Sequence, residues 1–208
     1  MRKLFYFFFK YLCWFFFKIY CRIESYNTEK VPVKGGVLVA SNHTSYLDPL
    51  ILGAALKRQA TFMAKEDLFT IPLVGTFVKA FSSPLRRGHP QPSSIKDAVQ
   101  RLRRGEVIAL FPEGIRSADG SLLDAKRGVG LIAAMGCSVV VPVYIDGSSN
   151  ALPVGAKFIR PAKIRVFFGD PIEKETGESG KDFQQRVIGY IIDAIRRCKD
   201  PSEGNKRR

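Results

Sequence analysis

The sequence has few of the residues from which metal sites and disulfide frames are built. It contains only two histidines and four cysteines, and the cysteines form no C-x-x-C pair. A structural zinc site needs clustered ligands of these types, so we expect no resident metal. At 208 residues the chain is long enough to bury one sizeable core without cross-links. We therefore expect free thiols and a reducing compartment.

At its amino terminus the chain lacks an apolar run long enough to cross a bilayer comfortably. The run from Leu4 to Phe17 would rise about 21 Å as a helix, at about 1.5 Å per residue. The hydrocarbon core of a bilayer is about 30 Å thick. Small residues for signal cleavage are missing near Ile23, and Lys10 interrupts the run, which argues against a secretory signal.

Acidic residues are scarce. The chain has 33 lysines and arginines against 19 acidic residues, a formal charge of +14. Such an excess favours an anionic partner: a membrane surface, a phosphorylated substrate or nucleic acid. We expect no nucleic acid partner, because the aromatic residues gather at the N-terminus rather than among the basic loops, and no recognition motif is present.

What the sequence has in abundance is aromatic residues at its start. Eleven of the first twenty residues are aromatic, and Lys3, Lys10 and Lys18 would share one face of a helix. Aromatic rings favour the headgroup region of a bilayer. The pattern predicts an interfacial membrane helix over residues 1–23, with its lysines toward anionic lipid. The alternative is a helix packed only against its own domain.

From Glu24 onward, short apolar runs alternate with helix-like segments, with no internal repeat and no dividing linker. This alternation predicts an α/β fold: a single layered domain over residues 24–199, with a mixed, largely parallel sheet flanked by helices. Residues 200–208 are expected to form a flexible basic tail. Pro142 interrupts an apolar run, which indicates a bulge or a strand end beside something bound.

One polar cluster follows the apolar run "GVLVA" and reads "NHTSYLD". Helical positions five apart lie about 140° apart, so His43 and Asp48 can meet only if His43 lies in the turn before the helix. Asp48 would then orient the imidazole and leave its other nitrogen to take a proton. In the alternative interpretation Asn42 or Ser41 caps the helix and Asp48 is solvated.

Two further polar clusters along the chain contain basic residues. "PLRRGHP" holds Arg86 and Arg87, a pair that suits bidentate phosphate binding but is also common on surfaces. "LFPEGIRSADGSLLDAKRG" places Glu113, Arg116 and Lys126 in a loop directly after a strong strand. The loop is long for a strand-to-helix connection, which favours a functional role over a solvated link.

In this order, "NHTSYLD", "LRRG", "FPEGIRS" and "VVVPVYI" resemble the motifs of the glycerolipid acyltransferases, the lysophosphatidic acid (1-acylglycerol-3-phosphate) acyltransferase family. The resemblance covers about residues 37–144. It implies that His43 is the catalytic base and Asp48 its partner. Ile115 departs from the family pattern, which usually has threonine there, without removing a charge.

The resemblance also implies a set of substrate-binding residues. Arg87 matches the arginine of the second motif better than Arg86 does. The third motif, assigned in the family to the glycerol-phosphate acceptor, and the "KRG" that often follows it supply the rest of the set: Glu113, Gly114, Arg116 and Lys126. Pro142 matches the fourth motif, associated with the acyl-donor region.

The implied reaction transfers an acyl chain from a thioester to the sn-2 hydroxyl of lysophosphatidic acid, giving phosphatidic acid. It needs no cofactor beyond the co-substrate, which is acyl-CoA or acyl-carrier protein, and it implies location at the cytoplasmic face of a membrane. The alternatives are another lysophospholipid or glycerol-phosphate acceptor, a hydrolase, and a non-catalytic basic membrane-binding module. A covalent serine or cysteine route is disfavoured, because no G-x-S-x-G elbow is present.

Overall fold

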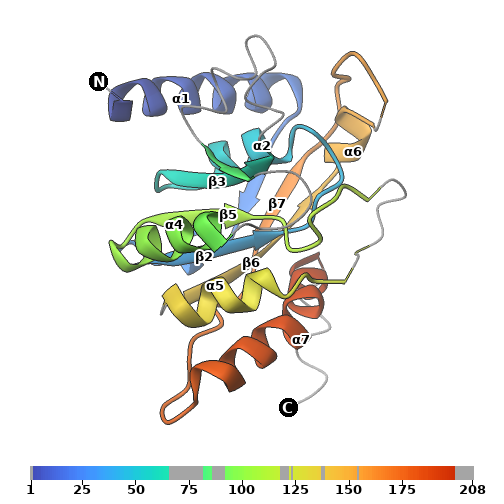
Figure 1. Cartoon of the computed structure of the whole chain (residues 1–208). Coiled ribbons are helices and arrows are strands. Elements are labelled where there is room, and N and C mark those ends of the chain that lie inside the picture. Colours follow the sequence, from blue (N-terminus) through green and yellow to red (C-terminus); the bar gives the residue numbers. More distant parts are fainter. Residues whose placement is uncertain are drawn as a thin grey trace.

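In the described residues the protein is a seven-stranded sheet covered by helices on both faces (Figure 1). The computed structural model describes residues 2–65, 82–85, 92–117, 122, 124–136, 139–153 and 155–199. In spatial order the strands run β1-β7-β6-β2-β5-β3-β4. Their bounds are β1 Glu24–Tyr26, β2 Val37–Ser41, β3 Ala60–Lys65, β4 Ser82–Leu85, β5 Val107–Leu110, β6 Val139–Asp146 and β7 Arg165–Phe168.

The helices divide between the two faces of this sheet. They are α1 Arg2–Tyr20, η1 Thr28–Lys30, α2 Asp48–Ala55, α4 Pro92–Arg103, α5 Gly128–Gly136, α6 Ser148–Ala151 and α7 Gly180–Lys199. One core cluster joins α1 and α2 to the sheet, and a second joins α4, α5 and α7 to its other face. Figure 1 shows α1 and α7 at opposite ends of the molecule, with the sheet between them.

Strand β2 shows how the two faces are built. All five of its residues are buried, and side chains alternate between faces along a strand. Val37 and Val39 pack with α1 and α2, whereas Leu38 and Ala40 pack with α4, α5 and α7. Burial on both faces explains why this strand reads as a continuous apolar run in the sequence.

The fold class expected from the sequence is confirmed. Neighbouring strands pair in parallel, except that β6 and β7 are antiparallel, so the sheet is mixed and largely parallel. The tail expected at residues 200–208 lies outside the described residues. Because β2 and β5 are parallel neighbours, the loops that follow them leave the sheet at the same edge.

Pro142 lies inside β6, a strand with neighbours on both sides. Its register explains why a proline is tolerated there. Val143 pairs with Phe168, and Val140 bridges to Ile172, so two residues of β6 face three residues, 169–171. This one-residue surplus is a bulge in the ladder, and the Pro142 oxygen still accepts from Gly169 N at 2.8 Å. The missing proline N–H therefore falls where regular pairing is already broken.

Helix α1 lies against the domain along one side, and one of its lysines is not placed as the sequence suggested. Tyr6 and Phe17 are buried in the core, and Lys10 is only 9% exposed. The Lys10 ammonium donates to the Leu56 carbonyl, at the C-terminal end of α2 where a cation is favoured. Burial lowers the Lys10 pKa. The expectation that all three lysines face lipid is therefore wrong for Lys10.

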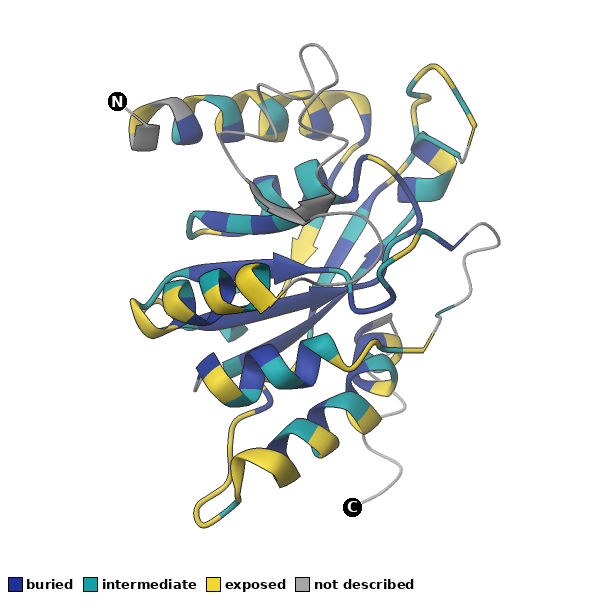
Figure 2. Cartoon of the chain, viewed as in Figure 1, coloured by how far each residue is buried: buried dark blue, intermediate teal, exposed yellow. Residues whose placement is uncertain are grey.

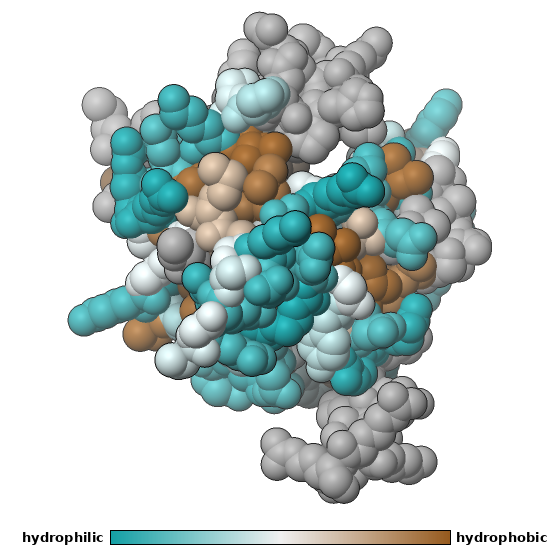
Figure 3. All heavy atoms as spheres, turned by 60° about the horizontal axis from the view of Figure 1, so that its bottom comes forward, coloured by the Kyte–Doolittle hydropathy of each residue, from teal (hydrophilic) through white to brown (hydrophobic). Residues whose placement is uncertain are grey.

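The other long helix, α7, has the usual amphipathic form. Phe183, Val187 and Ile191 are fully buried against α5 and the sheet. Its outer side carries charged residues, including Arg186 and Arg196, which pair with acidic residues of the same region. Figure 3, which turns the lower side of Figure 1 forward, shows mostly hydrophilic side chains across the centre of that side.

Candidate active site

His43 and Asp48 meet in the turn between β2 and α2, as their spacing predicts. His43 Nδ1 lies 2.9 Å from Asp48 Oδ2, and Asp48 is the fully buried first residue of α2. The same oxygen accepts the backbone N–H groups of Thr44 and Ser45 at 2.7 and 2.8 Å. An acceptor with these partners places the proton on Nδ1, so Nε2 is the nitrogen that can take one.

The imidazole is also fixed by stacking. Its ring lies 4.0 Å from the Phe111 ring, centroid to centroid, with 15° between the planes. The His43 side chain is 18% exposed, so a substrate can reach it while most of its surface is covered. A base held in one rotamer and one tautomer is ready for proton transfer without reorganisation.

The rest of the turn is anchored to β6 and the residues after it. Asn42 Nδ2 donates to the Ile145 carbonyl at 2.9 Å, and Ile145 N donates back to Asn42 Oδ1 at 2.7 Å. Thr44 and Ser148 share a hydroxyl contact at 3.0 Å. The capping interpretation is therefore wrong: α2 begins after Leu47 without a side-chain cap, Asn42 joins the turn to β6, and Asp48 is buried rather than solvated. These positioning contacts were missed by sequence reasoning, although a run of polar residues after a buried strand is a usable signal.

The loop after β5 forms hydrogen bonds with both the backbone N–H and the carbonyl group of His43. Glu113 Oε1 accepts the His43 N–H at 3.1 Å, and Ser117 N donates to the His43 carbonyl at 2.9 Å. Glu113 is only 3% exposed. The resemblance assigned Glu113 to the acceptor; the structure shows a contact that positions the histidine. The first and third motifs thus form one unit, 70 residues apart in the chain.

Two cations of this loop lie beside that unit. The Arg116 guanidinium lies 3.5 Å from the centre of the Tyr46 ring. Among the described residues its buried Nη1 has no hydrogen-bond partner, so it can donate to a bound anion. Lys126 N donates to the Pro112 carbonyl at 2.9 Å, which holds the lysine near the motif. Arg87 lies outside the described residues, so its predicted role is untested.

Gly114 lies beneath the Lys126 side chain in a backbone conformation that favours glycine. Its φ of +70° is a conformation that side chains disfavour. A Cβ at this position would also lie 2.6 Å from Lys126 Nζ. The ammonium therefore lies directly over the glycine, in space that any larger residue would fill.

The described thiols and Ser45 are poorly suited to covalent catalysis. Burial raises the pKa of Cys13 to about 11 and that of Cys198 to about 12, so both remain thiols at neutral pH. Ser45 is fully buried, and its hydroxyl donates to the Leu152 carbonyl while accepting from Leu47 N. Its oxygen is used to shape the turn. Cys137 lies outside the described residues.

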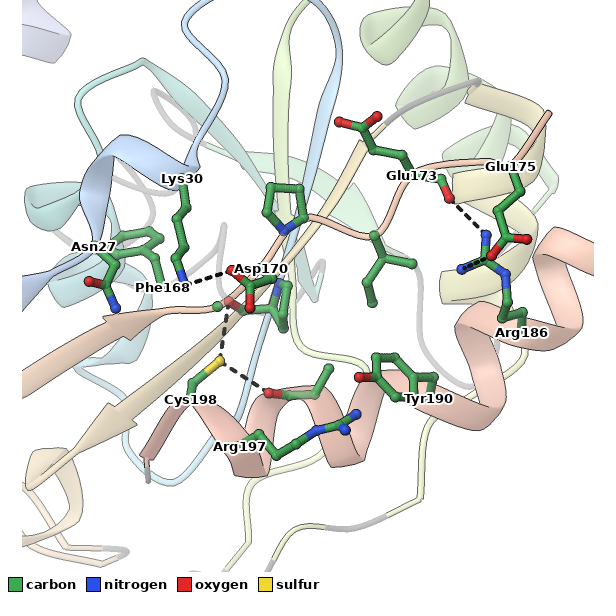
Figure 4. Close-up of a pocket in the computed structure, with 15 residues that line it drawn as sticks. Asn27, Lys30, Phe168, Asp170, Glu173, Glu175, Arg186, Tyr190, Arg197 and Cys198 are labelled. Carbon is green, nitrogen blue, oxygen red and sulfur yellow. Dashed lines mark hydrogen bonds and ion pairs between the residues drawn. The ribbon is translucent and has the colours of Figure 1, made fainter. Parts of the chain in front are cut away.

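A separate cavity of about 860 Å³ lies between α7, η1 and the chain after β7 (Figure 4). Its charged lining is largely internally paired: Lys30 binds Asp170 at 2.7 Å, and Arg186 binds Glu175 at 3.6 Å. Among the described residues of the four motifs, Pro142 lines it. In the part of the chain that the structure describes, no cluster of three histidine, cysteine or acidic side chains could hold a metal.

Comparison with known proteins gives a consistent result. The family model described as Acyltransferase matches residues 22–146, which include all four motifs. A 1-acyl-sn-glycerol-3-phosphate acyltransferase of Bacillus subtilis is 33% identical over 154 residues, covering 73% of this chain and 74% of the relative.

A chloroplastic protein of the same name from Arabidopsis thaliana is 30% identical over 76% of this chain, which spans about half of that longer relative. Among solved structures, the 1-acyl-sn-glycerophosphate acyltransferase PlsC of Thermotoga maritima has the same fold, with a TM-score of 0.79. That match is 24% identical and covers 96% of this chain and 81% of the other.

Proposed function

The chain belongs to the acyltransferase family, and from this premise we propose that it is a 1-acyl-sn-glycerol-3-phosphate acyltransferase. It would transfer an acyl chain from a thioester to the free sn-2 hydroxyl of lysophosphatidic acid, in phospholipid biosynthesis. The observation that carries the proposal is the 2.9 Å contact between His43 Nδ1 and Asp48 Oδ2, in a turn whose backbone is held by the loop with Arg116 and Lys126.

The proposed chemistry needs one proton to move twice. An alcohol does not ionise at neutral pH, so His43 Nε2 takes the hydroxyl proton as the oxygen attacks the thioester carbonyl. Asp48 stabilises the resulting imidazolium. When the tetrahedral intermediate collapses, the carbon–sulfur bond breaks, and the imidazolium returns the proton to the leaving thiolate. The products are phosphatidic acid and a free thiol.

Binding of the acceptor phosphate falls to the cations of the third motif. Arg116 has an unpartnered buried nitrogen among the described residues, and Lys126 Nζ lies over Gly114. A guanidinium and an ammonium together suit a phosphomonoester. Because their loop is bonded to the His43 backbone, binding the phosphate fixes the distance between the acceptor hydroxyl and the base.

We further propose that α1 binds the membrane interface at the cytoplasmic face. Within the described residues no helix is both long and apolar enough to cross a membrane. Yet α1 exposes Phe8 at 67%, Phe15 at 59% and Ile19 at 65%. These exposed apolar side chains, on a chain with a formal charge of +14, favour binding of α1 to an anionic bilayer surface.

The test uses the purified full chain with acyl-CoA and acyl-carrier protein as donors. The acceptors are lysophosphatidic acid, a lysophosphodiester and glycerol 3-phosphate, and both the thiol and the acylated lipid are measured. We expect transfer to lysophosphatidic acid, and a loss of about 10²- to 10⁴-fold in His43→Ala. Undiminished turnover in His43→Ala would exclude the mechanism. Thiol release without acylated lipid would indicate a hydrolase, and vesicle binding without turnover a binding module.

A further inference from the structure

The loop from Gly155 to Arg160, called the aromatic-basic loop below, has a composition unusual for a solvated connection. Phe158 is 80% exposed, as much as any large apolar residue that the structure describes. Lys157 and Arg160 on either side of it are also exposed. The exposed ring keeps apolar area in water, and another phase or a partner that covered this area would be favoured.

The loop is held in place. Ala156 N donates to the Pro153 carbonyl at 3.0 Å, and Arg160 N donates to the Ala151 carbonyl at 2.8 Å. Ile159 packs against the core cluster that contains α1 and α2. With these anchors on both sides, the exposure of Phe158 follows from the fixed path of the backbone.

The aromatic-basic loop continues the apolar surface of α1. Tyr20, the last residue of α1, donates its hydroxyl to the Ile159 carbonyl at 3.1 Å. Ile19 and Tyr20 are both exposed, at 65% and 39%. Figures 1 and 2 show the loop, largely exposed, beyond the C-terminal end of α1 and on the same side of the sheet.

We infer that the aromatic-basic loop is a second membrane contact, which inserts Phe158 at the headgroup level of an anionic phospholipid bilayer while Lys157 and Arg160 bind lipid phosphates. The inference rests on the proposed function of α1 and extends it to a separate segment. The chemistry agrees with the surface: aromatic rings prefer the interface, and basic residues beside it are attracted to anionic lipid.

This contact would set the height of the catalytic turn above the membrane. The chain that leads into the loop is bonded to that turn, through Ser148 to Thr44 and through the Leu152 carbonyl to Ser45. Contacts of the loop and of α1 with the bilayer would therefore fix the position of the turn relative to the membrane at two points. The acceptor headgroup would meet His43 at a fixed depth.

Tryptophan fluorescence can test each contact separately, because the chain has a single tryptophan, Trp14 in α1. The wild type reports on α1. The double variant Trp14→Phe/Phe158→Trp reports on the loop. The control is Trp14→Phe/Tyr190→Trp, whose new tryptophan replaces a residue 42% exposed on α7, across the sheet. Each protein is mixed with phosphatidylglycerol vesicles that carry brominated acyl chains.

We expect vesicles to shift the emission of Trp14 and of the tryptophan at position 158 to shorter wavelength and to quench both, leaving the control unchanged. Quenching of Trp14 alone overturns the inference but leaves the α1 contact intact. Quenching of neither contradicts the proposed membrane binding, while turnover measured on detergent-dispersed lysophosphatidic acid tests the proposed reaction independently. Concentration-dependent emission without vesicles would identify a second copy as the occupant and also overturn the inference.

The charge of the loop provides a second test. Lys157→Gln and Arg160→Gln should each weaken binding to phosphatidylglycerol vesicles about fivefold, with little change on phosphatidylcholine vesicles. Lys174→Gln is the matched control, since Lys174 is exposed near α7. Equal losses in all three variants would mean that net charge alone acts, and would overturn the specific contact.

Discussion

The His43 turn and helix α1 both depart from the usual distribution of side chains: the turn buries polar groups, and the helix exposes apolar ones. The turn buries Asn42, Thr44, Ser45 and Asp48, whereas α1 exposes phenylalanines. In the turn each of these side chains has a hydrogen-bond partner, although the second carboxylate oxygen of Asp48, Oδ1, has none among the described residues. The polar side chains of the turn are thus largely paired within the chain, whereas the exposed rings of α1 are available to a surface outside it.

The strongest test of the turn removes only the charge of its carboxylate. Asp48→Asn keeps an oxygen for the Thr44 and Ser45 N–H groups but no longer stabilises an imidazolium. We expect kcat to fall about 10²- to 10⁴-fold with vesicle binding unchanged. The control is Asp193→Asn, whose carboxylate is 60% exposed on α7. Comparable losses in both variants would contradict a special role for Asp48.

Two phenylalanines of α1 can test which face of the helix packs against the domain and which face binds the membrane. Phe17 is 1% exposed and Phe15 is 59% exposed. Phe17→Ala should lower the free energy of unfolding by about 3–5 kcal/mol, as truncation of a buried phenylalanine does. Phe15→Ala should change it by at most about 0.5 kcal/mol and instead weaken vesicle binding. Urea unfolding and vesicle flotation measure the two effects; a stability loss in Phe15→Ala would assign that face to the domain.

Glu113 links the turn to the third motif, and two substitutions separate positioning from acceptor binding. Glu113→Gln keeps an oxygen to accept the His43 N–H, whereas Glu113→Ala leaves that buried donor unpaired, at a cost of about 1–3 kcal/mol. We expect kcat to fall about 5- to 150-fold in Glu113→Ala and far less in Glu113→Gln. A raised KM for lysophosphatidic acid in Glu113→Gln, with unchanged kcat, would instead indicate contact with the acceptor.

The smallest expected effect concerns Tyr46, whose ring lies against Arg116. Cation–π contacts contribute about 0.5–2 kcal/mol, so Tyr46→Leu should raise the KM for the acceptor about 2- to 30-fold. Tyr46→Phe keeps the ring and should behave as wild type. Steady-state kinetics distinguish them: a loss in Tyr46→Phe would implicate the hydroxyl, and no change in Tyr46→Leu would show that Arg116 needs no support.

Much of this arrangement could be predicted from the sequence, since it depends on local pattern. The buried strands β2 and β5 read as apolar runs, and the spacing of His43 and Asp48 fixed where the histidine had to lie. What escaped prediction depends on which segments become neighbours. Nothing local to Asn42 indicates Ile145 as its partner, because that contact exists only once β6 lies beside β2.

The same limit applies to single charged residues. Lys10 looked like one of three lysines on a lipid-facing stripe, but the C-terminal end of α2 lies within reach of its ammonium. Glu113 was assigned to the acceptor through the family resemblance, yet its carboxylate also binds the His43 backbone. In both cases the residue type shows that the side chain is charged, but its interaction partner is determined by the tertiary structure.

The distance in sequence between Asn42 and Ile145 also has a consequence for biosynthesis. These partners are 103 residues apart, so the catalytic turn cannot be completed until β6 has left the ribosome. At about 5–20 residues per second, that gap corresponds to roughly 5–20 s of synthesis. Helix α1 emerges long before then. The aromatic helix is therefore exposed to its surroundings before the contacts that hold the catalytic turn can form.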